Sequence, residues 1–224
     1  MLLNNDSAYY VFIVLFTYRR YKMKFLSDSW FKIKGNEYLK RAMEVSLTGD
    51  FNITVIGKRE NGYFPLLELL GNKLTFIVPC KCNELNILEY CACDILDKIK
   101  YQRKNELKES LNNPIIVKLE SPVLSDFNSI NKDTYEDVMN HINRVKKFIA
   151  TNEINKDMLK MDRSAYDLLD TAINRLHLTV NSIENIKNVA VIIAVMDHFS
   201  FGIKAQHVSE AVSFQCYRFM NDVI

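Results

Sequence analysis

The chain of 224 residues is long enough to bury a hydrophobic core, and its length predicts one or two domains. Hydrophobic residues make up 48% of it and charged residues 25%, with only 6 glycines and 4 prolines, which excludes a disordered or low-complexity protein. A formal net charge of +2 predicts no strong nonspecific attraction to nucleic acid or to a membrane surface.

The N-terminal region joins a short apolar run to basic residues that follow it. Residues 8–18, AYYVFIVLFTY, are too few to cross a bilayer, which takes about 20 apolar residues. A signal peptide carries its basic residues before the apolar run, whereas those at 19–22 come after it. Three interpretations stay open for residues 1–24: an anchor remnant, a segment packed on the domain, and an extension ahead of a natural start at Met23. The most apolar stretch elsewhere, residues 189–195, is also too short, so we expect a cytoplasmic protein without membrane contact.

Helix and strand patterns alternate in residues 25–127. Apolar residues at a helical period predict a helix over 36–48, ended by Gly49. Short apolar runs rich in β-branched residues predict strands over 51–56, 74–78 and 115–119. Between them we expect a helix of about two turns over 65–70, ended by Gly71 and Asn72, and a polar amphipathic helix over 95–111. This part is therefore predicted to be a small α/β domain.

Residues 128–224 carry an almost entirely helical pattern without strands. The first helix, over 133–150, places Val138, Ile142, Val145 and Ile149 on one face. Three further helices are expected over 162–178, with Asp162 as N-cap, over 181–199 and over 204–220. The pattern thus predicts a second, helical domain of about four helices.

Two glycines after the first strand have the spacing of a phosphate-binding loop. Gly57 and Gly62 match G-x-x-x-x-G, with a strand before and a helix after. A working loop continues with a lysine that contacts the phosphates and a hydroxyl that binds magnesium, whereas here Tyr63 and Phe64 follow. On the loop alone, an ordinary strand-to-helix turn is the simpler interpretation.

The segments around the loop change that interpretation. Residues 33–57, IKGNEYLKRAMEVSLTGDFNITVIG, resemble the segment before the Walker A loop in magnesium-chelatase-like AAA+ ATPases of the ComM/YifB branch, where I-x-G-x-x-x-x-K-R-A-x-E-[IV] precedes a strand. Residues 74–102 resemble the family's sensor-1 strand and cysteine-bearing segment, and residues 112–127 resemble its next strand. Residues 172–215 resemble the lid, with its R-L-x-L-S-x-R and I-x-x-x-H-[IV]-x-E-A patterns. The resemblance covers most of residues 31–218.

This resemblance implies a fold as well as a family. The family sheet has the strand order 5-1-4-3-2, and this chain keeps strands one, four and five but lacks two and three, which are neighbours at one edge. The resemblance therefore implies a small three-stranded parallel sheet, a remnant P-loop AAA+ core over 25–127 with the loop strand in its middle, followed by an α-helical lid bundle over 128–224. The strand over 74–78 becomes an apolar edge, which we expect the N-terminal 25 residues, the cysteine segment or a second protomer to cover.

The groups that the family directs at triphosphate and magnesium are replaced. Position by position, the Walker A lysine and hydroxyl fall on Tyr63 and Phe64, the sensor-1 asparagine on Val78, the Asp-Arg pair on Asn112 and Asn113, and the lid arginines on Asn181, Asn188 and Val191. No Walker B sequence follows the loop, and VIIAVMDH at 191–198, which mimics one, is interpreted as core packing. Because phosphoryl transfer depends on such charges, we expect a pseudo-ATPase without catalytic residues, to which ATP and magnesium do not bind productively.

The loop itself remains a candidate site. Its residues are Gly57, Lys58, Arg59, Glu60, Asn61, Gly62, Tyr63 and Phe64. Lys58 and Arg59 could bind an anion together with backbone N–H groups, and a solvated charged turn is the alternative.

Four cysteines form a C-x-C-x8-C-x-C pattern. They are Cys80, Cys82, Cys91 and Cys93. Disulfides are not expected in the cytosol, and four thiolates can hold zinc tetrahedrally. Since C-x-C is not the commonest ligand spacing, a zinc site and a retained loop of free thiols both stay open.

Three functions from different classes follow. The first is a catalytically inactive AAA+ remnant that acts as a binding or regulatory protein, alone, by self-association or with an intact AAA+ relative. The second is an ATP-binding protein without hydrolysis, and the third is a zinc-stabilised protein- or DNA-binding module. By resemblance, intact members are ring-forming ATPases and the ComM branch acts on DNA, so nucleic acid enters as a partner by family analogy.

Overall fold

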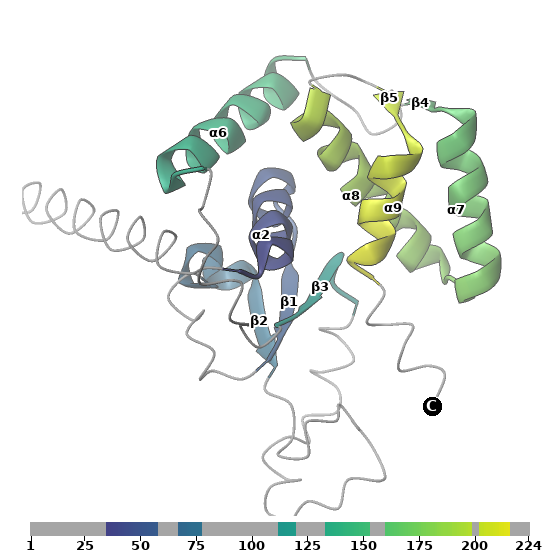
Figure 1. Ribbon diagram of the computed structural model, residues 1–224, viewed down its shortest axis with the longest axis horizontal. Helices are drawn as coiled ribbons and strands as arrows, with labels where there is room; N and C mark the ends of the chain where they lie inside the picture. The colour runs from purple at the N-terminus through teal and green to yellow at the C-terminus, as the bar shows by residue number, and fades with distance from the viewer. Residues whose placement is uncertain are drawn as a thin grey trace, which may run out of the picture.

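The computed structural model describes residues 35–57, 67–77, 112–119, 133–152, 160–198 and 202–215 (Figure 1). In chain order the elements are α2 (Glu37–Gly49), β1 (Ile53–Ile56), the 3-10 helix η2 (Glu68–Lys73), β2 (Leu74–Ile77), β3 (Ile115–Lys118), α6 (Tyr135–Thr151), β4 (Lys160–Met161), α7 (Arg163–Leu176), α8 (Val180–His198), β5 (Gly202–Ile203) and α9 (Ala205–Ser213). The described part is thus mixed α/β and mostly helical. Within it, no helix is both long enough and apolar enough to cross a membrane.

A three-stranded parallel sheet forms the centre of the α/β part. The strand order is β2-β1-β3, so β1, the strand before the glycine-spaced loop, lies in the middle as expected. Ile53 stands opposite Leu74 on one side and Ile115 on the other, and both ladders run in this register to the end of β1. All four residues of β1 are buried, because a central parallel strand is covered on both faces. This burial explains why its sequence is a continuous apolar run interrupted only by Thr54, which is also buried.

Helix α2 lies over the sheet and joins it to the helices of the second half (Figure 1). It packs against β3, α6 and α8 through a fully buried face that includes Leu39, Met43 and Val45. The helix ends at Gly49, as predicted, but the left-handed residue that ends it is Asp50 (φ 59°). Gly49 is needed for close packing instead: a Cβ there would lie 2.3 Å from the ring of Phe51.

The four predicted helices of the second half are present as α6, α7, α8 and α9. On α6, Val138, Ile142 and Val145 are buried, and Ile149 is partly buried against the same core. Asp162 caps α7 as predicted, since its Oδ1 accepts a hydrogen bond from the Ala165 N–H at 2.7 Å. The Walker B mimic lies in α8, where residues 191 and 193–196 are buried, which confirms its interpretation as core packing.

Two details of the predicted elements were wrong. The second half does contain strands: Lys160 and Met161 pair in parallel with Gly202 and Ile203 as β4 and β5, and two-residue strands are too short to give a sequence pattern. The short helix expected over 65–70 is, in its described portion, of the 3-10 type, within Glu68–Lys73. Its helical backbone is broken at Gly71 (φ 55°, ψ −127°), where the sequence placed the end of the helix.

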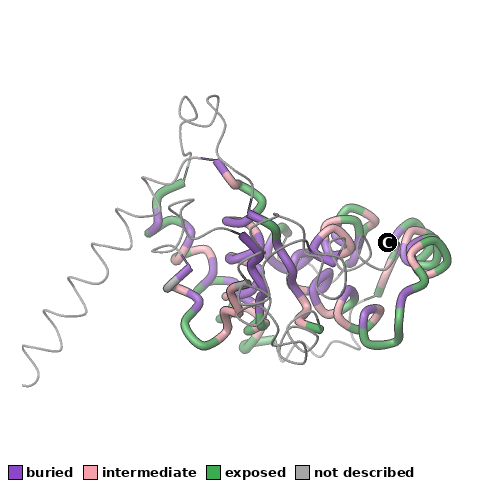
Figure 2. The backbone as a smooth tube through the Cα atoms, turned by 90° about the horizontal axis from the view of Figure 1, so that it is seen from below, coloured by how far each residue is buried: buried purple, intermediate pink, exposed green. Residues whose placement is uncertain are grey.

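One hydrophobic core spans both halves. Buried side chains of α2 and the sheet pack in the same cluster as those of α6, α8 and α9, and Figure 2 shows buried stretches concentrated in the interior of the fold. At the free side of β3, the Ile116 N–H donates to the carbonyl oxygen of Phe214, just after α9, at 2.9 Å. The domain boundary expected near residue 128 stays a prediction, because residues 120–132 lie outside the described part.

Candidate functional site

The described structure reaches the glycine-spaced loop only at its first residue. Gly57 follows β1, and a Cβ there would lie 2.6 Å from the Cβ of Leu119. The Leu119 N–H donates to the Ile56 carbonyl at 2.7 Å, so the ends of β1 and β3 are drawn together at this point. The absence of a side chain at Gly57 is therefore required by packing, with or without a phosphate ligand.

Several sequence-predicted site residues lie outside the described residues. They are Lys58, Arg59, Glu60, Asn61, Gly62, Tyr63, Phe64, Val78 and the four cysteines Cys80, Cys82, Cys91 and Cys93. The predicted cover of the β2 edge, from the first 25 residues, the cysteine segment or a second protomer, also involves parts that are not described. These expectations stay predictions.

The two asparagines before β3 lie in a turn that is held by neutral hydrogen bonds. Asn113 Nδ2 donates to Thr54 Oγ1 on β1 at 2.9 Å. Asn185 of α8 donates from its Nδ2 to the Asn112 carbonyl at 3.1 Å. Gln215, beyond α9, donates from its Nε2 to the Asn113 carbonyl at 3.1 Å. Where the resemblance places an acid and an arginine, the turn instead joins the sheet to the helical half.

The three lid positions do not form one constellation. Asn181 is exposed near the start of α8, Asn188 is half-buried and Val191 is buried. Asn188 and Val191 line a common groove between α7 and α8, and Asn181 is not part of its lining.

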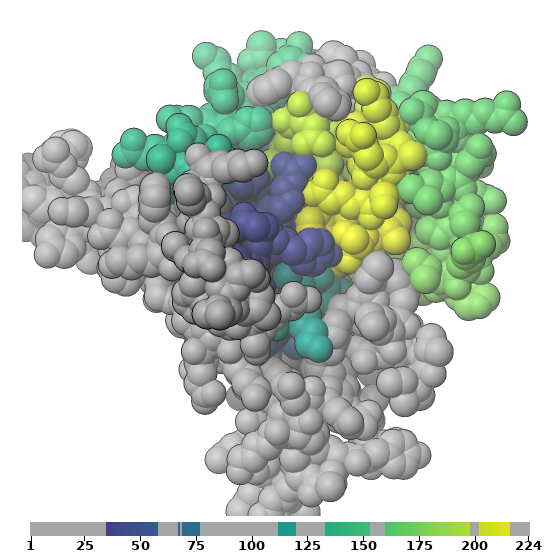
Figure 3. All heavy atoms as spheres, viewed as in Figure 1, coloured from purple at the N-terminus to yellow at the C-terminus, as the bar shows by residue number. Residues whose placement is uncertain are grey.

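The strongest polar constellation among the described residues was missed by the sequence analysis. We call Arg41, Glu44, Asp197 and Glu210 the Arg41 cluster. Arg41 of α2 donates from Nε to Glu210 Oε1 of α9 at 2.8 Å, and from Nη2 to Asp197 Oδ1 of α8 at 2.7 Å. Its Nη1 lies 3.8 Å from Glu44 Oε2, one turn along α2. Figure 3 shows α2 and α9 in contact, and the ion pair between Arg41 and Glu210 joins these two helices.

Charge in the Arg41 cluster is unbalanced, with three carboxylates around one guanidinium. Burial raises the pKa of Glu44 to about 7, even though Arg41 acts in the opposite direction, and the negative charges of Asp133, Glu210 and Glu37 raise it further. Burial also lowers the pKa of Arg41, but the hydrogen bonds and charges of Glu210 and Asp197 outweigh it and hold that pKa above its usual range. At neutral pH Glu44 is therefore partly protonated, which relieves repulsion among the carboxylates.

The histidines stand on separate helical segments without ligand spacing, a pattern that predicts helix surfaces or caps, and the buried ring of His207 departs from a surface position. Its side chain is fully buried, and its Nδ1 accepts a hydrogen bond from the Lys204 N–H at 3.0 Å at the start of α9. Its Nε2 lies 3.8 Å from Asp197 Oδ2, so the ring borders the Arg41 cluster. His177 is exposed at the C-cap of α7, as expected. Burial lowers the pKa of His141, with Arg144 and Arg41 contributing.

No group of three or more metal-ligating side chains occurs in the described ranges. The Arg41 cluster pairs its acids with an arginine on three helices, which is a structural arrangement and leaves no ligand set for a cation. Its sequence signal lay in the two quoted motifs, K-R-A-x-E and H-[IV]-x-E-A, but nothing local indicates that residues 169 positions apart form a pair.

A scan of the chain against models of known protein families gave no match. A search of curated proteins also found no match.

Proposed function

We propose that this chain is a shortened, degenerate protein of the magnesium-chelatase/ComM-like AAA+ class that has lost ATP hydrolysis and acts as a binding or regulatory protein. The observation that carries the proposal is the hydrogen-bonded ion pair between Arg41 and Glu210 at 2.8 Å. It joins the two sequence segments that most closely follow the family patterns.

The ion pair gives the family-like residues a common structural role. Ala42 and Ala211 are fully buried beside Arg41 and Glu210 in their helices, and His207 is buried next to the same cluster. The two motifs were quoted from separate parts of the sequence. Their meeting at one interface is the expected result if both descend from a fold in which the α/β core is joined to a helical lid. This agreement supports the proposal at the level of ancestry, while function must be argued from the site.

The strand order supports the proposal independently. Removing two neighbouring strands from one edge of a 5-1-4-3-2 sheet leaves the loop strand in the middle of three, which is the order β2-β1-β3. A sheet shortened at its edge keeps every remaining ladder, so it can still fold.

The proposed loss of hydrolysis rests on the side chains that replace the family's charged and magnesium-binding groups. Asn112 and Asn113 take the place of a charged pair, and Asn113 donates to Thr54 within the fold. Tyr63 and Phe64 can supply neither a phosphate-binding cation nor a ligand for magnesium. Since one arginine finger alone contributes about 10³-fold or more in rate, loss of all these groups leaves no catalysis above background.

The experiment is a titration of the purified full chain with a fluorescent ATP analogue, with and without magnesium, together with a phosphate-release assay, zinc analysis and a mass measurement. We expect no release above buffer. Magnesium-independent binding would favour the ATP-binding alternative, and one zinc per chain with salt-dependent DNA binding would favour the zinc module. Steady hydrolysis that is lost in Tyr63→Ala or Gly62→Val but kept in the surface variant Val180→Ala would refute the proposal.

A further inference from the structure

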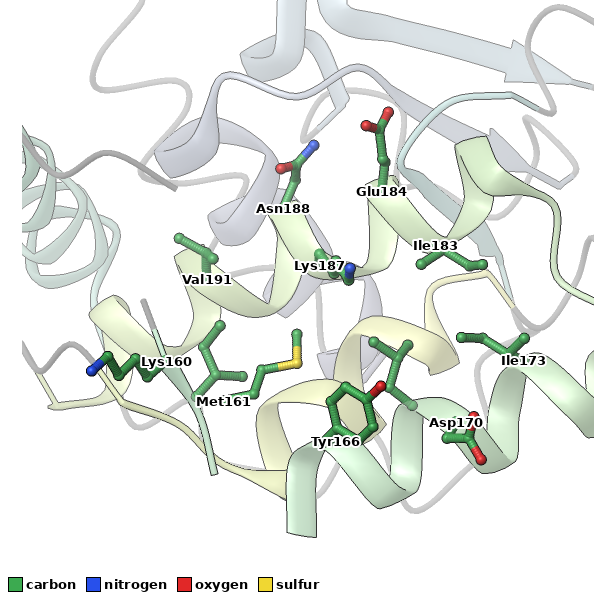
Figure 4. A pocket seen from close by; sticks show the side chains of 12 residues that line it. Lys160, Met161, Tyr166, Asp170, Ile173, Ile183, Glu184, Lys187, Asn188 and Val191 are labelled. Atoms are coloured by element: carbon green, nitrogen blue, oxygen red, sulfur yellow. The ribbon is translucent and has the colours of Figure 1, made fainter. Parts of the chain in front are cut away.

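Two helices of the second half, α7 and α8, border a groove. α9 packs against both α7 and α8, while α7 and α8 make few contacts with each other. The space between them is a groove of about 890 Å³, and β4 and β5 close one end of it (Figure 4). The groove is therefore bordered along its length by α7 and α8.

The floor of the groove is apolar and already excluded from water. Leu169, Val191 and Ile203 are nearly completely buried and form it. Half-buried apolar side chains line the walls above this floor: Met161, Ile173 and Ile183. Tyr166 stands at the α7 rim and is 65% exposed, which makes it one of the most exposed large hydrophobic side chains in the described part. Tyrosine is enriched at protein interfaces because its ring supplies apolar area while its hydroxyl can stay hydrated.

The spacing of the lining residues fits a helix as the occupant. On α7 they fall at positions 166, 169, 170 and 173, and on α8 at 183, 184, 187, 188 and 191. Both sets follow the i, i+3, i+4, i+7 pattern of one helix face, so two parallel ridges border the groove. The α8 ridge is about 12 Å long at 1.5 Å per residue, which accommodates two to three turns of a third helix.

The charged residues at the rim make one end of the groove positive and the other more negative. Lys160 lies at the β4 end, whereas Asp170 and Glu184 lie further toward the opposite end, with Lys187 between them (Figure 4). These four charges sum to zero, which disfavours a nucleic acid as the occupant. Because a helix is negative at its C-terminal end and positive at its N-terminal end, an occupant with its C-terminus near Lys160 matches the charges at both ends.

We propose that the groove between α7 and α8 binds an amphipathic helix of a partner protein, with its apolar stripe against Tyr166 and the half-buried side chains of Met161, Ile173 and Ile183, and its C-terminal end at Lys160. It rests on the proposed function as a binding protein and deepens it by naming the class of partner. It does not involve the glycine-spaced loop, so this test and the nucleotide titration can fail separately.

The test uses the full chain and fluorescein-labelled 15-residue synthetic helices, with binding followed by anisotropy. One peptide carries leucines in an i, i+3, i+4, i+7 stripe and two glutamates in its last turn. A second has the same composition in scrambled order, and a third replaces the two glutamates with lysines. We expect the striped peptide with glutamates to bind at least tenfold more tightly than the scrambled one.

Three protein variants locate the binding. Tyr166→Glu at the rim should weaken binding of the striped peptide by tenfold or more. Val180→Glu is the matched control, because Val180 is 74% exposed on α8 but does not line the groove, and it should change binding by less than twofold. Lys160→Glu should reverse the preference, so that the lysine-ended peptide binds more tightly than the glutamate-ended one.

Three results would overturn the proposal. The first is equal binding, or none, for the striped and scrambled peptides. The second is binding that Tyr166→Glu leaves unchanged, with circular dichroism showing a folded variant. The third is a dimer of the purified chain that Tyr166→Glu converts to a monomer, which would assign the groove to a second copy of this chain.

Discussion

Replacing Glu44 by glutamine tests the electrostatics of the Arg41 cluster directly. The side chain of Glu44 is 20% exposed, and burial raises its pKa from an ordinary value of 4.5 to about 7. Between these two values the folded protein keeps a proton that the unfolded chain has released. The free energy of unfolding therefore falls as the pH rises from about 4.5 through 7. Glutamine has the size of the protonated acid but cannot ionise, so it should remove this loss.

The magnitude follows from the two pKa values. At about 1.4 kcal/mol per pH unit, raising the pKa from 4.5 to about 7 costs the wild-type protein at most roughly 3–4 kcal/mol once the pH exceeds 7. Glu44→Gln should therefore be more stable than the wild-type protein at pH 8, by up to that amount, and the difference should shrink toward pH 5. His141 has a lowered pKa and acts in the opposite direction, so the two proteins must be compared at each pH.

Urea unfolding followed by circular dichroism at pH 5, 6, 7 and 8 provides the measurement. The difference in midpoint, at equal slope, gives the difference in free energy. Glu136→Gln is the matched control, because Glu136 is an exposed glutamate of α6, and its effect should be small at every pH. A Glu44→Gln protein that is less stable at pH 8, or whose advantage is the same at pH 5 and pH 8, would refute the assignment of a buried, partly protonated Glu44.

Three further predictions concern stability and use thermal or urea unfolding. Arg41→Met should lower the free energy of unfolding by about 2–4 kcal/mol, because it leaves carboxylates at a half-buried interface without their cation. A double-mutant cycle with Glu210→Gln should give a coupling energy of more than about 0.5 kcal/mol, and additive effects would contradict the pairing. Gly57→Ala should cost about 1–3 kcal/mol through overlap with Leu119, and a neutral result would show that the strand ends have room for a side chain. Asp162→Ala should cost about 1 kcal/mol by removing the cap of α7, whereas Asp162→Asn should restore most of it; equal losses would argue against capping.

The sequence predicted the elements whose signals are local. β1 is a short apolar run that the structure buries on both faces. Asp162 indicates the start of α7, because its side chain caps that helix. The middle position of β1 was predicted only through the family resemblance, because a strand's neighbours depend on chain segments far away. The β4 and β5 pair is two residues long on each side, which is below the length at which alternation can be recognised.

The candidate site was harder to predict than the fold. Arg41 and Glu210 each stand in a recognisable motif, but their pairing depends on how α2 and α9 pack. His207 was predicted at a helix surface or cap because the histidines stand on separate helical segments without ligand spacing. The structure buries its ring while the ring nitrogen accepts from the backbone at the helix start, and only the packed fold reveals both roles together.

The bond between Ile116 and Phe214 has a consequence for biosynthesis. Gln215, which also holds the turn before β3, lies 101 residues after Pro114. At about 5–20 residues per second, a ribosome needs roughly 5–20 s to complete that stretch. Throughout this interval Phe214, whose carbonyl accepts the hydrogen bond from Ile116 of β3, has not yet been synthesised. The nascent sheet therefore passes through a stage with an open strand on this side, when capture by a chaperone or by another nascent chain competes with completion of the fold.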